Sequence, residues 1–168
     1  LSKVIYVDKI DELYYEGHLR KVEASPLKSA LSLKEAKIWL KEAEETFKVG
    51  FYRSSRVSTY FAVLHASRSV TLRDGVEVED PLYLVNYLEK YCAEGNLSLK
   101  CLDVLTVIFN LNYEDQHHFQ TTRNPDDLKQ AIDFGHEFIN CIKNLLDKTA
   151  RLPRSVIKNS IRENEYGG

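Results

Sequence analysis

The residues of this chain best suited to acid–base chemistry lie in one polar segment, residues 110–120, which reads NLNYEDQHHFQ. Within it, His117 and His118 are adjacent and Asp115 is close by, so the segment could supply an acid and a base near neutral pH. Such a pair could help an RNA 2′-hydroxyl attack its own phosphodiester, a reaction that also needs a cation to stabilise the developing charge. The alternative interpretation is a polar connector whose histidines cap helix ends, and the residues alone favour it.

Cationic residues also occur on the largely apolar segment 50–75, GFYRSSRVSTYFAVLHASRSVTLRDG. Its apolar residues surround most of a helical circumference, which is typical of a central helix covered by several others. Ionisable side chains on such a helix must be paired or must line a groove. The segment therefore predicts either a polar crevice that binds a ligand or a core pair of His65 and Arg68 satisfied by an acidic residue. For Arg53 and Arg56, phosphate binding and simple solvation both remain open. The candidate ligand-binding residues are Arg53, Arg56, Tyr60, His65 and Arg68.

Helix signals account for most of the chain. Ser32 and Glu35 form a capping box, in which the serine caps the third helical amide and the glutamate reaches back. Gly75 after Asp74 is suited to a left-handed helix end, and Asp80-Pro81 suits a helix start. We predict six helices, over residues 2–22, 32–50, 52–73, 81–94, 98–109 and 124–147. The fifth is indicated by an apolar stripe that follows Ser98 and reaches residue 109.

These elements predict an all-α fold, an antiparallel up-down bundle of four core helices. The N-terminal helix and the 81–94 helix should pack at its side. We expect a single domain over residues 1–150, with its core at 32–147, followed by a basic amphipathic tail at 151–168. The tail is either a solvated terminal helix or an arm that grips a partner subunit or a phosphate backbone.

Composition limits the classes of function. Of the 168 residues, 43% are hydrophobic, so the main body should fold. The formal net charge of -2 gives no general attraction to nucleic acid, so such binding would need a local patch. No apolar run approaches the roughly 18 residues of a membrane span, and no signal-peptide pattern is present. We therefore expect a cytoplasmic protein that does not bind or span a membrane.

Metal and cofactor chemistry is not indicated. Cys92, Cys101 and Cys141 form no Cys-x-x-Cys pair, and with His117 and His118 they match no standard zinc spacing. We expect no metal site and three reduced thiols near helix-packing faces. The chain has no Gly-rich phosphate loop, and no cofactor is predicted.

Three segments in order carry a family resemblance: AKIWLKEA at 36–43, GFY at 50–52 and YFAVLHA at 60–66. The chain resembles the HEPN (higher eukaryotes and prokaryotes nucleotide-binding) family over about residues 32–147. The resemblance implies a helical bundle that forms a homodimer through the central and last core helices and takes a nucleotide or RNA ligand. It also implies a small nucleotidyltransferase as a partner, in a toxin–antitoxin-like pair.

Family members with ribonuclease activity carry an Arg and then a His, with four to six residues between them, near the start of the last core helix. In this chain Asn110 stands where the Arg is expected, and His117 or His118 matches the His. Because a neutral amide cannot supply the cation that the reaction needs, the sequence favours a non-catalytic module that binds nucleotide, RNA or a partner. The alternative is a metal-independent ribonuclease that uses His117 and His118, with Asp115, in a dimer cleft.

Overall fold

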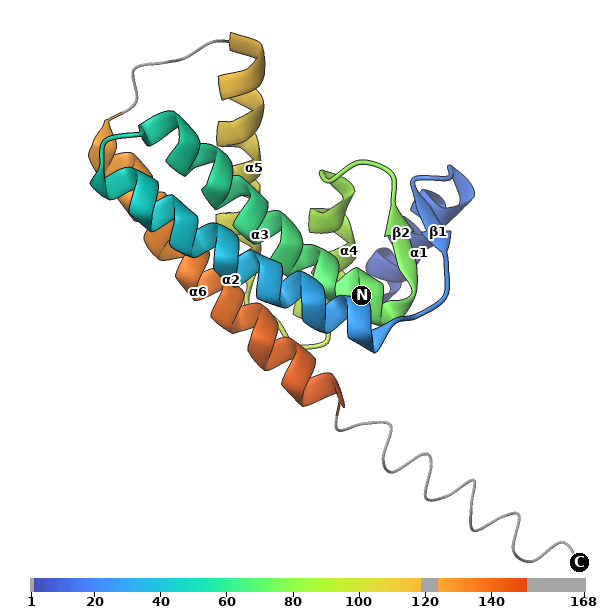
Figure 1. The fold of residues 1–168 in the computed structure, drawn as a ribbon. Helices are drawn as coiled ribbons and strands as arrows, with labels where there is room; N and C mark the ends of the chain where they lie inside the picture. Colours follow the sequence, from blue (N-terminus) through green and yellow to red (C-terminus); the bar gives the residue numbers. More distant parts are fainter. Residues whose placement is uncertain (1, 119–123, 151–168) are drawn as a thin grey trace, which may run out of the picture.

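The structure is a computed structural model that describes residues 2–118 and 124–150. It is an all-α bundle, as predicted, with one small antiparallel sheet (Figure 1). In chain order the elements are α1 (Ser2–Tyr15), β1 (Leu19–Lys21), α2 (Pro26–Lys48), α3 (Tyr52–Asp74), β2 (Val76–Val78), α4 (Tyr83–Ala93), α5 (Leu99–His118) and α6 (Pro125–Ala150).

The helices α2, α3 and α6 run alongside one another, and α5 crosses them and extends past the start of α3 (Figure 1). The helices α1 and α4 pack together beside the sheet, at the end of the bundle where α3 finishes (Figure 1). This arrangement matches the prediction of four core helices with two flanking ones. None of the helices in the described ranges is long and apolar enough to span a membrane.

The predicted start of α2 is wrong by several residues. The helix begins at Pro26, after Ser25, whose Oγ accepts a hydrogen bond from the Lys28 amide at 3.2 Å. Ser32 therefore lies inside the helix, where it is buried and donates its hydroxyl to the carbonyl oxygen of His65 at 2.8 Å. The serine that resembles a cap instead joins α2 to α3.

The predicted helix over residues 2–22 is also too long. The helix α1 ends at Tyr15, Gly17 follows with φ of 83°, and residues 19–21 form β1. This strand pairs antiparallel with β2, with Leu19 opposite Val78 and Lys21 opposite Val76. Three residues are too few to show a periodicity, so neither strand could be predicted from its residue pattern.

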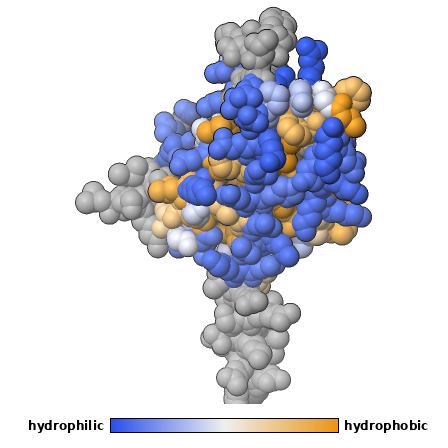
Figure 2. Space-filling model, turned by 90° about the vertical axis from the view of Figure 1, so that its left-hand side faces the viewer, coloured by the Kyte–Doolittle hydropathy of each residue, from blue (hydrophilic) through white to orange (hydrophobic). Residues whose placement is uncertain are grey.

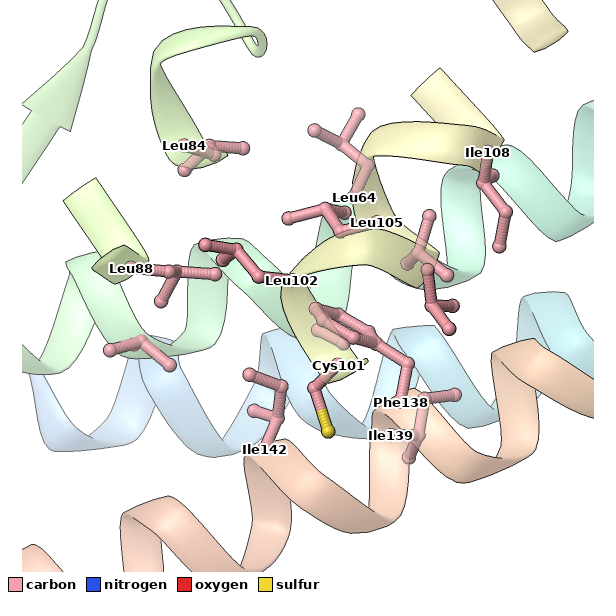
Figure 3. Close-up of a cluster of buried hydrophobic side chains, with 14 of the residues drawn as sticks. Leu64, Leu84, Leu88, Cys101, Leu102, Leu105, Ile108, Phe138, Ile139 and Ile142 are labelled. Carbon is pink, nitrogen blue, oxygen red and sulfur yellow. The ribbon is translucent and has the colours of Figure 1, made fainter. Parts of the chain in front are cut away.

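The core lies between α3, α4, α5 and α6 (Figure 3). Leucines of α4 and α5 meet Leu64 of α3 on one side, and Phe138 and Ile142 of α6 close the other side. The face of α3 toward α2 is different, because it carries small and hydroxyl side chains rather than the expected ring of large apolar ones. These hydroxyls bond to backbone carbonyl oxygens: Ser55 donates to that of Ala43 at 2.7 Å and Thr59 to that of Ser55 at 2.8 Å, for example.

A disulfide joins Cys101 of α5 to Cys141 of α6. The expectation of three reduced thiols is therefore wrong, and only Cys92 is a free cysteine. The two partners are 40 residues apart, and their pairing depends on how the two helices pack, which no sequence spacing reveals.

Gly75 ends α3 in the left-handed conformation, as predicted, with φ of 72°. A Cβ atom there would lie 2.6 Å from the carbonyl oxygen of Val22 and 3.0 Å from the amide nitrogen of Ala24. The chain after β1 thus passes directly over this glycine, and the Val22 amide donates to the Gly75 carbonyl oxygen at 2.9 Å. The sheet lies against the end of α3 because this position has no side chain.

We expect Gly75→Ala to destabilise the fold more than Gly95→Ala. Gly95 has a similar φ of 77° but open space around it, so its substitution costs only the backbone strain, roughly 1–2 kcal/mol. Gly75→Ala adds a backbone clash, which should cost about 1–3 kcal/mol more. Denaturant unfolding of both variants measures the difference, and equal losses would contradict the close approach of the chain to Gly75.

Candidate ligand-binding face of α3

Four aromatic rings form a continuous row across three helices. The ring of Trp39 on α2 stacks on Phe61 of α3, with centroids 4.9 Å apart. Phe61 contacts Tyr60 edge-on at 5.4 Å, and Tyr60 contacts Phe109 of α5 at 5.5 Å. Phe109 is buried, whereas the other three rings are only partly buried. We call these four residues the aromatic row.

Two residues at the centre of α3 add polar chemistry beside this row. The imidazole of His65 lies 6.5 Å from the ring of Phe61, and Arg68 follows one helical turn later with an exposed side chain. Among the described residues, Arg68 makes no hydrogen bond or ion pair to hold its guanidinium. We call the surface formed by the aromatic row, His65 and Arg68 the α3 face.

The titration of these groups is set mainly by burial. Partial burial lowers the pKa of His65, the positive charge of Arg68 lowers it further, and Glu35 opposes the shift. Burial likewise raises the pKa of Tyr60, against the effect of Arg68, while Asp80 adds to the rise. At neutral pH the α3 face therefore presents a neutral imidazole, a phenol and one cation.

The predicted ligand-binding residues divide into two groups. Tyr60, His65 and Arg68 come together on the α3 face. Because Arg68 is exposed, the alternative in which it forms a core pair with His65 is wrong. Arg53 is exposed near the start of α3, about 22 Å from Arg68 along the helix axis at 1.5 Å per residue. Arg56 is half-buried and already engaged with other groups.

The predicted acid–base segment is helical rather than a loop as far as His118, since α5 extends to that residue. Asn110 is exposed on this helix. The side chains of Asp115, His117 and His118 lie outside the described part of the structure, as does the basic tail at 151–168. The described residues contain no group of His, Cys, Asp and Glu side chains that could hold a metal ion.

Three members of the aromatic row, Trp39, Phe61 and Phe109, were not predicted from the sequence as parts of a site. Phe61 and Phe109 sit within apolar stripes, where aromatic residues ordinarily serve the core. The available signal was Trp39, the only tryptophan in the chain, which follows the exposed Ile38 at the margin of the buried face of α2. A large ring at such a margin often marks a surface used for recognition.

Comparison with known proteins agrees with the resemblance in the sequence. The family model described as HEPN domain matches residues 29–145, which extend from α2 into α6. No match was found among curated proteins. The α3 face lies wholly inside the matched residues, whereas α1 and β1 precede them.

We expect His65 to make the stability of the fold depend on pH. Because its folded pKa lies below the value of about 6.5 for an unfolded chain, the unfolded state binds more protons as the pH falls through that value. The contribution of His65 to stability is therefore complete above about pH 6.5 and decreases as the pH falls toward the folded pKa.

Denaturant unfolding at pH 7.5 and 5.5 tests this expectation, together with an NMR titration of the imidazole. His65→Gln should lose less stability on acidification than the unmodified chain. The control variant His136→Gln removes an exposed histidine that pairs with Glu44 at 2.8 Å, and it should retain the effect of His65. An imidazole of His65 that titrates above pH 6.5 would contradict the expected lowering of its pKa.

Proposed function

Because this chain belongs to the HEPN domain family, we propose that it is a non-catalytic module that binds single-stranded RNA on the α3 face. Family membership supports a nucleotide- or RNA-related module. The observation that favours single-stranded RNA is the aromatic row, whose partly exposed rings lie beside a cation without an ion pair among the described residues.

Unpaired bases stack on aromatic side chains, and each such contact contributes about 1–3 kcal/mol without regard to base identity. Trp39 and Phe61 already stack on each other, so their partly exposed edges and faces offer adjacent positions for bases. Arg68 then supplies a charge for a phosphate, and the exposed Arg53 supplies a second one farther along α3. Paired bases would not fit this mode, because their faces are covered by neighbouring base pairs.

The absence of catalysis is proposed from the chemistry of one position. Cleavage by attack of the 2′-hydroxyl needs a cation beside the phosphate. Asn110 occupies the position where catalytic family members carry an Arg, and its exposed side chain is a neutral amide. A histidine base two turns farther along the chain would create a charge that Asn110 could not stabilise.

We also propose a homodimer, which family membership supports in general terms. The family resemblance alone implies a contact through the central and last core helices. However, α6 exposes no large apolar side chain among its described residues, whereas Leu27, Leu31 and Ile38 of α2 are 70%, 52% and 48% exposed. Their spacing places them on one stripe of the helix, so we assign the contact to α2.

Three exposed apolar side chains form a surface of modest extent. Figure 2 shows a different part of the molecule, the end at which α2 finishes and α3 and α6 begin, and there apolar groups are separated by hydrophilic ones. A contact surface of mixed apolar and polar character is typical of a non-obligate interface, in which each subunit also folds alone. From the sequence resemblance we further propose a small nucleotidyltransferase as partner in a toxin–antitoxin-like pair, which co-purification of the two proteins would test.

RNA binding can be followed through Trp39, because it is the only tryptophan and lies in the aromatic row. A ten-nucleotide single-stranded RNA should quench its fluorescence. Phe61→Leu keeps an apolar side chain but removes the stacking face, so the affinity should fall about 5- to 100-fold. Arg68→Gln should reduce the slope of log affinity against log salt by about 0.7, the value for one phosphate contact on a single strand.

The control for these variants is Lys143→Gln, which removes one exposed cation on α6 and should change neither the affinity nor the salt slope. In EDTA the RNA should remain intact throughout. Cleavage that disappears in the double variant His117→Ala with His118→Ala would establish the ribonuclease alternative. Unchanged affinity in Phe61→Leu would exclude the α3 face as the binding surface.

Sedimentation tests the proposed dimer. At a protein concentration of tens of micromolar, which is above the dissociation constant of an ordinary dimer, the unmodified chain should sediment as a dimer and the Ile38→Glu variant as a monomer. Leu99→Glu places the same charge on an exposed apolar position of α5, 65% exposed, and should remain dimeric. A dimer that survives Ile38→Glu would place the contact elsewhere.

A further inference from the structure

An open pocket of about 510 Å³ lies between α1, the sheet and α4, away from the α3 face. Its walls include Tyr14 of α1, Lys21 of β1, and Tyr87, Lys90 and Tyr91 of α4, with Asp74 among them. The matched family residues begin at position 29, so α1 and β1 contribute walls that the family model does not cover. The pocket therefore combines N-terminal residues outside the matched range with residues of α3, β2 and α4 inside it.

The carboxylate of Asp74 is fully occupied by protein groups. Its Oδ1 accepts hydrogen bonds from the guanidinium of Arg73, with the shorter contact at 2.9 Å. Its Oδ2 accepts from the hydroxyl of Tyr87 at 2.7 Å and also from that of Tyr91, and the Lys90 ammonium lies 3.6 Å away. Because its lone pairs are engaged, Asp74 is not available to bind a cationic ligand.

The cations around the pocket outnumber this one carboxylate. The ammonium of Lys90 lies over the rings of Tyr87 and Tyr91, at 4.0 Å and 4.8 Å from their centroids. Lys21 lies over the ring of Tyr14 at 5.9 Å, and no ion pair holds it among the described residues. Among the residues that line the pocket, Lys21 and Lys90 are positively charged and Asp74 is negatively charged. Arg73, outside the lining, pairs with Asp74 at 2.9 Å, and this leaves the two lysines as an excess of positive charge on the lining. The carboxylates of Asp11 and Glu94 act on Tyr14 and Lys90 from outside the lining.

The tyrosines do not offset this excess. Burial and the nearby Asp74 carboxylate raise the pKa of both Tyr87 and Tyr91, so both remain neutral phenols. Burial also lowers the pKa of Lys90, which means that its charged form lacks solvation and gains from an added anion. Both effects favour a negatively charged occupant.

We propose that this pocket binds a small phosphate monoester, with its phosphate between Lys21 and Lys90 and its organic part against Tyr14 and Val22. A dianionic phosphate can pair with both lysines of the lining, whereas a single carboxylate carries only one charge. The volume is within the range of small-molecule sites and leaves room for a sugar or a base beside the phosphate. The proposal does not depend on RNA binding at the α3 face.

Isothermal titration calorimetry tests the proposal, with the full chain titrated separately with AMP, ribose 5-phosphate, adenosine and ribose. AMP and ribose 5-phosphate should bind, adenosine and ribose should not, and inorganic phosphate should compete. Lys21→Gln should weaken AMP binding about 10- to 100-fold, as expected for the loss of a hydrogen bond to a charged group.

Arg20→Gln is the matched control. Arg20 precedes Lys21 on the same strand, so its side chain points to the opposite face, where it pairs with Glu77 at 2.9 Å. This variant loses the same charge and should bind AMP unchanged. Phe61→Leu should also bind AMP unchanged, which separates this proposal from the one on RNA.

Three results would overturn the proposal. The first is no binding of either phosphate ester, and the second is adenosine binding as tightly as AMP. The third is competition by RNA: a single-stranded RNA displaces AMP, and the Lys21→Gln substitution weakens the binding of RNA as much as that of AMP. This result would mean that the pocket binds a phosphate of a polynucleotide rather than a small phosphate monoester.

Discussion

The close approach of α2 and α3 is the constraint on which the rest of the structure depends. Ala36 and Ala43 of α2 and Ala62 of α3 are completely buried, and small side chains of this kind let two helices approach closely. Hydroxyl groups fix the pair from both ends, since Ser55 bonds the Ala43 carbonyl oxygen and Ser32 bonds that of His65. Only at this spacing does Trp39 reach the ring of Phe61, so the α3 face exists because the helices beneath it are close.

The parts of the fold that the sequence predicted are those set by local chemistry. Gly75 ends α3, and Ser98 and Asn124 precede α5 and α6, with side-chain oxygens that accept hydrogen bonds from the Cys101 and Asp126 amides. Ser32 misled the prediction because its partner is 33 residues away in sequence, on another helix. The pairing of β1 with β2 likewise joins segments more than fifty residues apart, and nothing in either segment alone indicates it.

The sites follow the same division. The proximity of Tyr60, His65 and Arg68 could be predicted from the sequence, because one helix carries all three and helical spacing alone places them near one another. The aromatic row draws on three helices, and the pocket near Asp74 joins residues from position 14 to position 91. Both depend on the register between helices. Because this register is set by the packing of side chains from distant segments, it cannot be predicted from a single sequence. The charge excess near Asp74 is also invisible in a chain whose formal net charge is -2.

The disulfide between α5 and α6 has a topological consequence. Cys101 and Cys141, with a sequence separation of 40, close a covalent ring that contains the whole polar segment 110–120 and the connection to α6. In the chain-entropy description, closing a ring of this size disfavours the unfolded ensemble by about 4 kcal/mol. A protease that cuts once inside the ring would leave one covalently joined molecule, and its two pieces would separate only after reduction. The segment richest in acid–base groups can therefore be severed in oxidising surroundings without detaching α6 from the bundle.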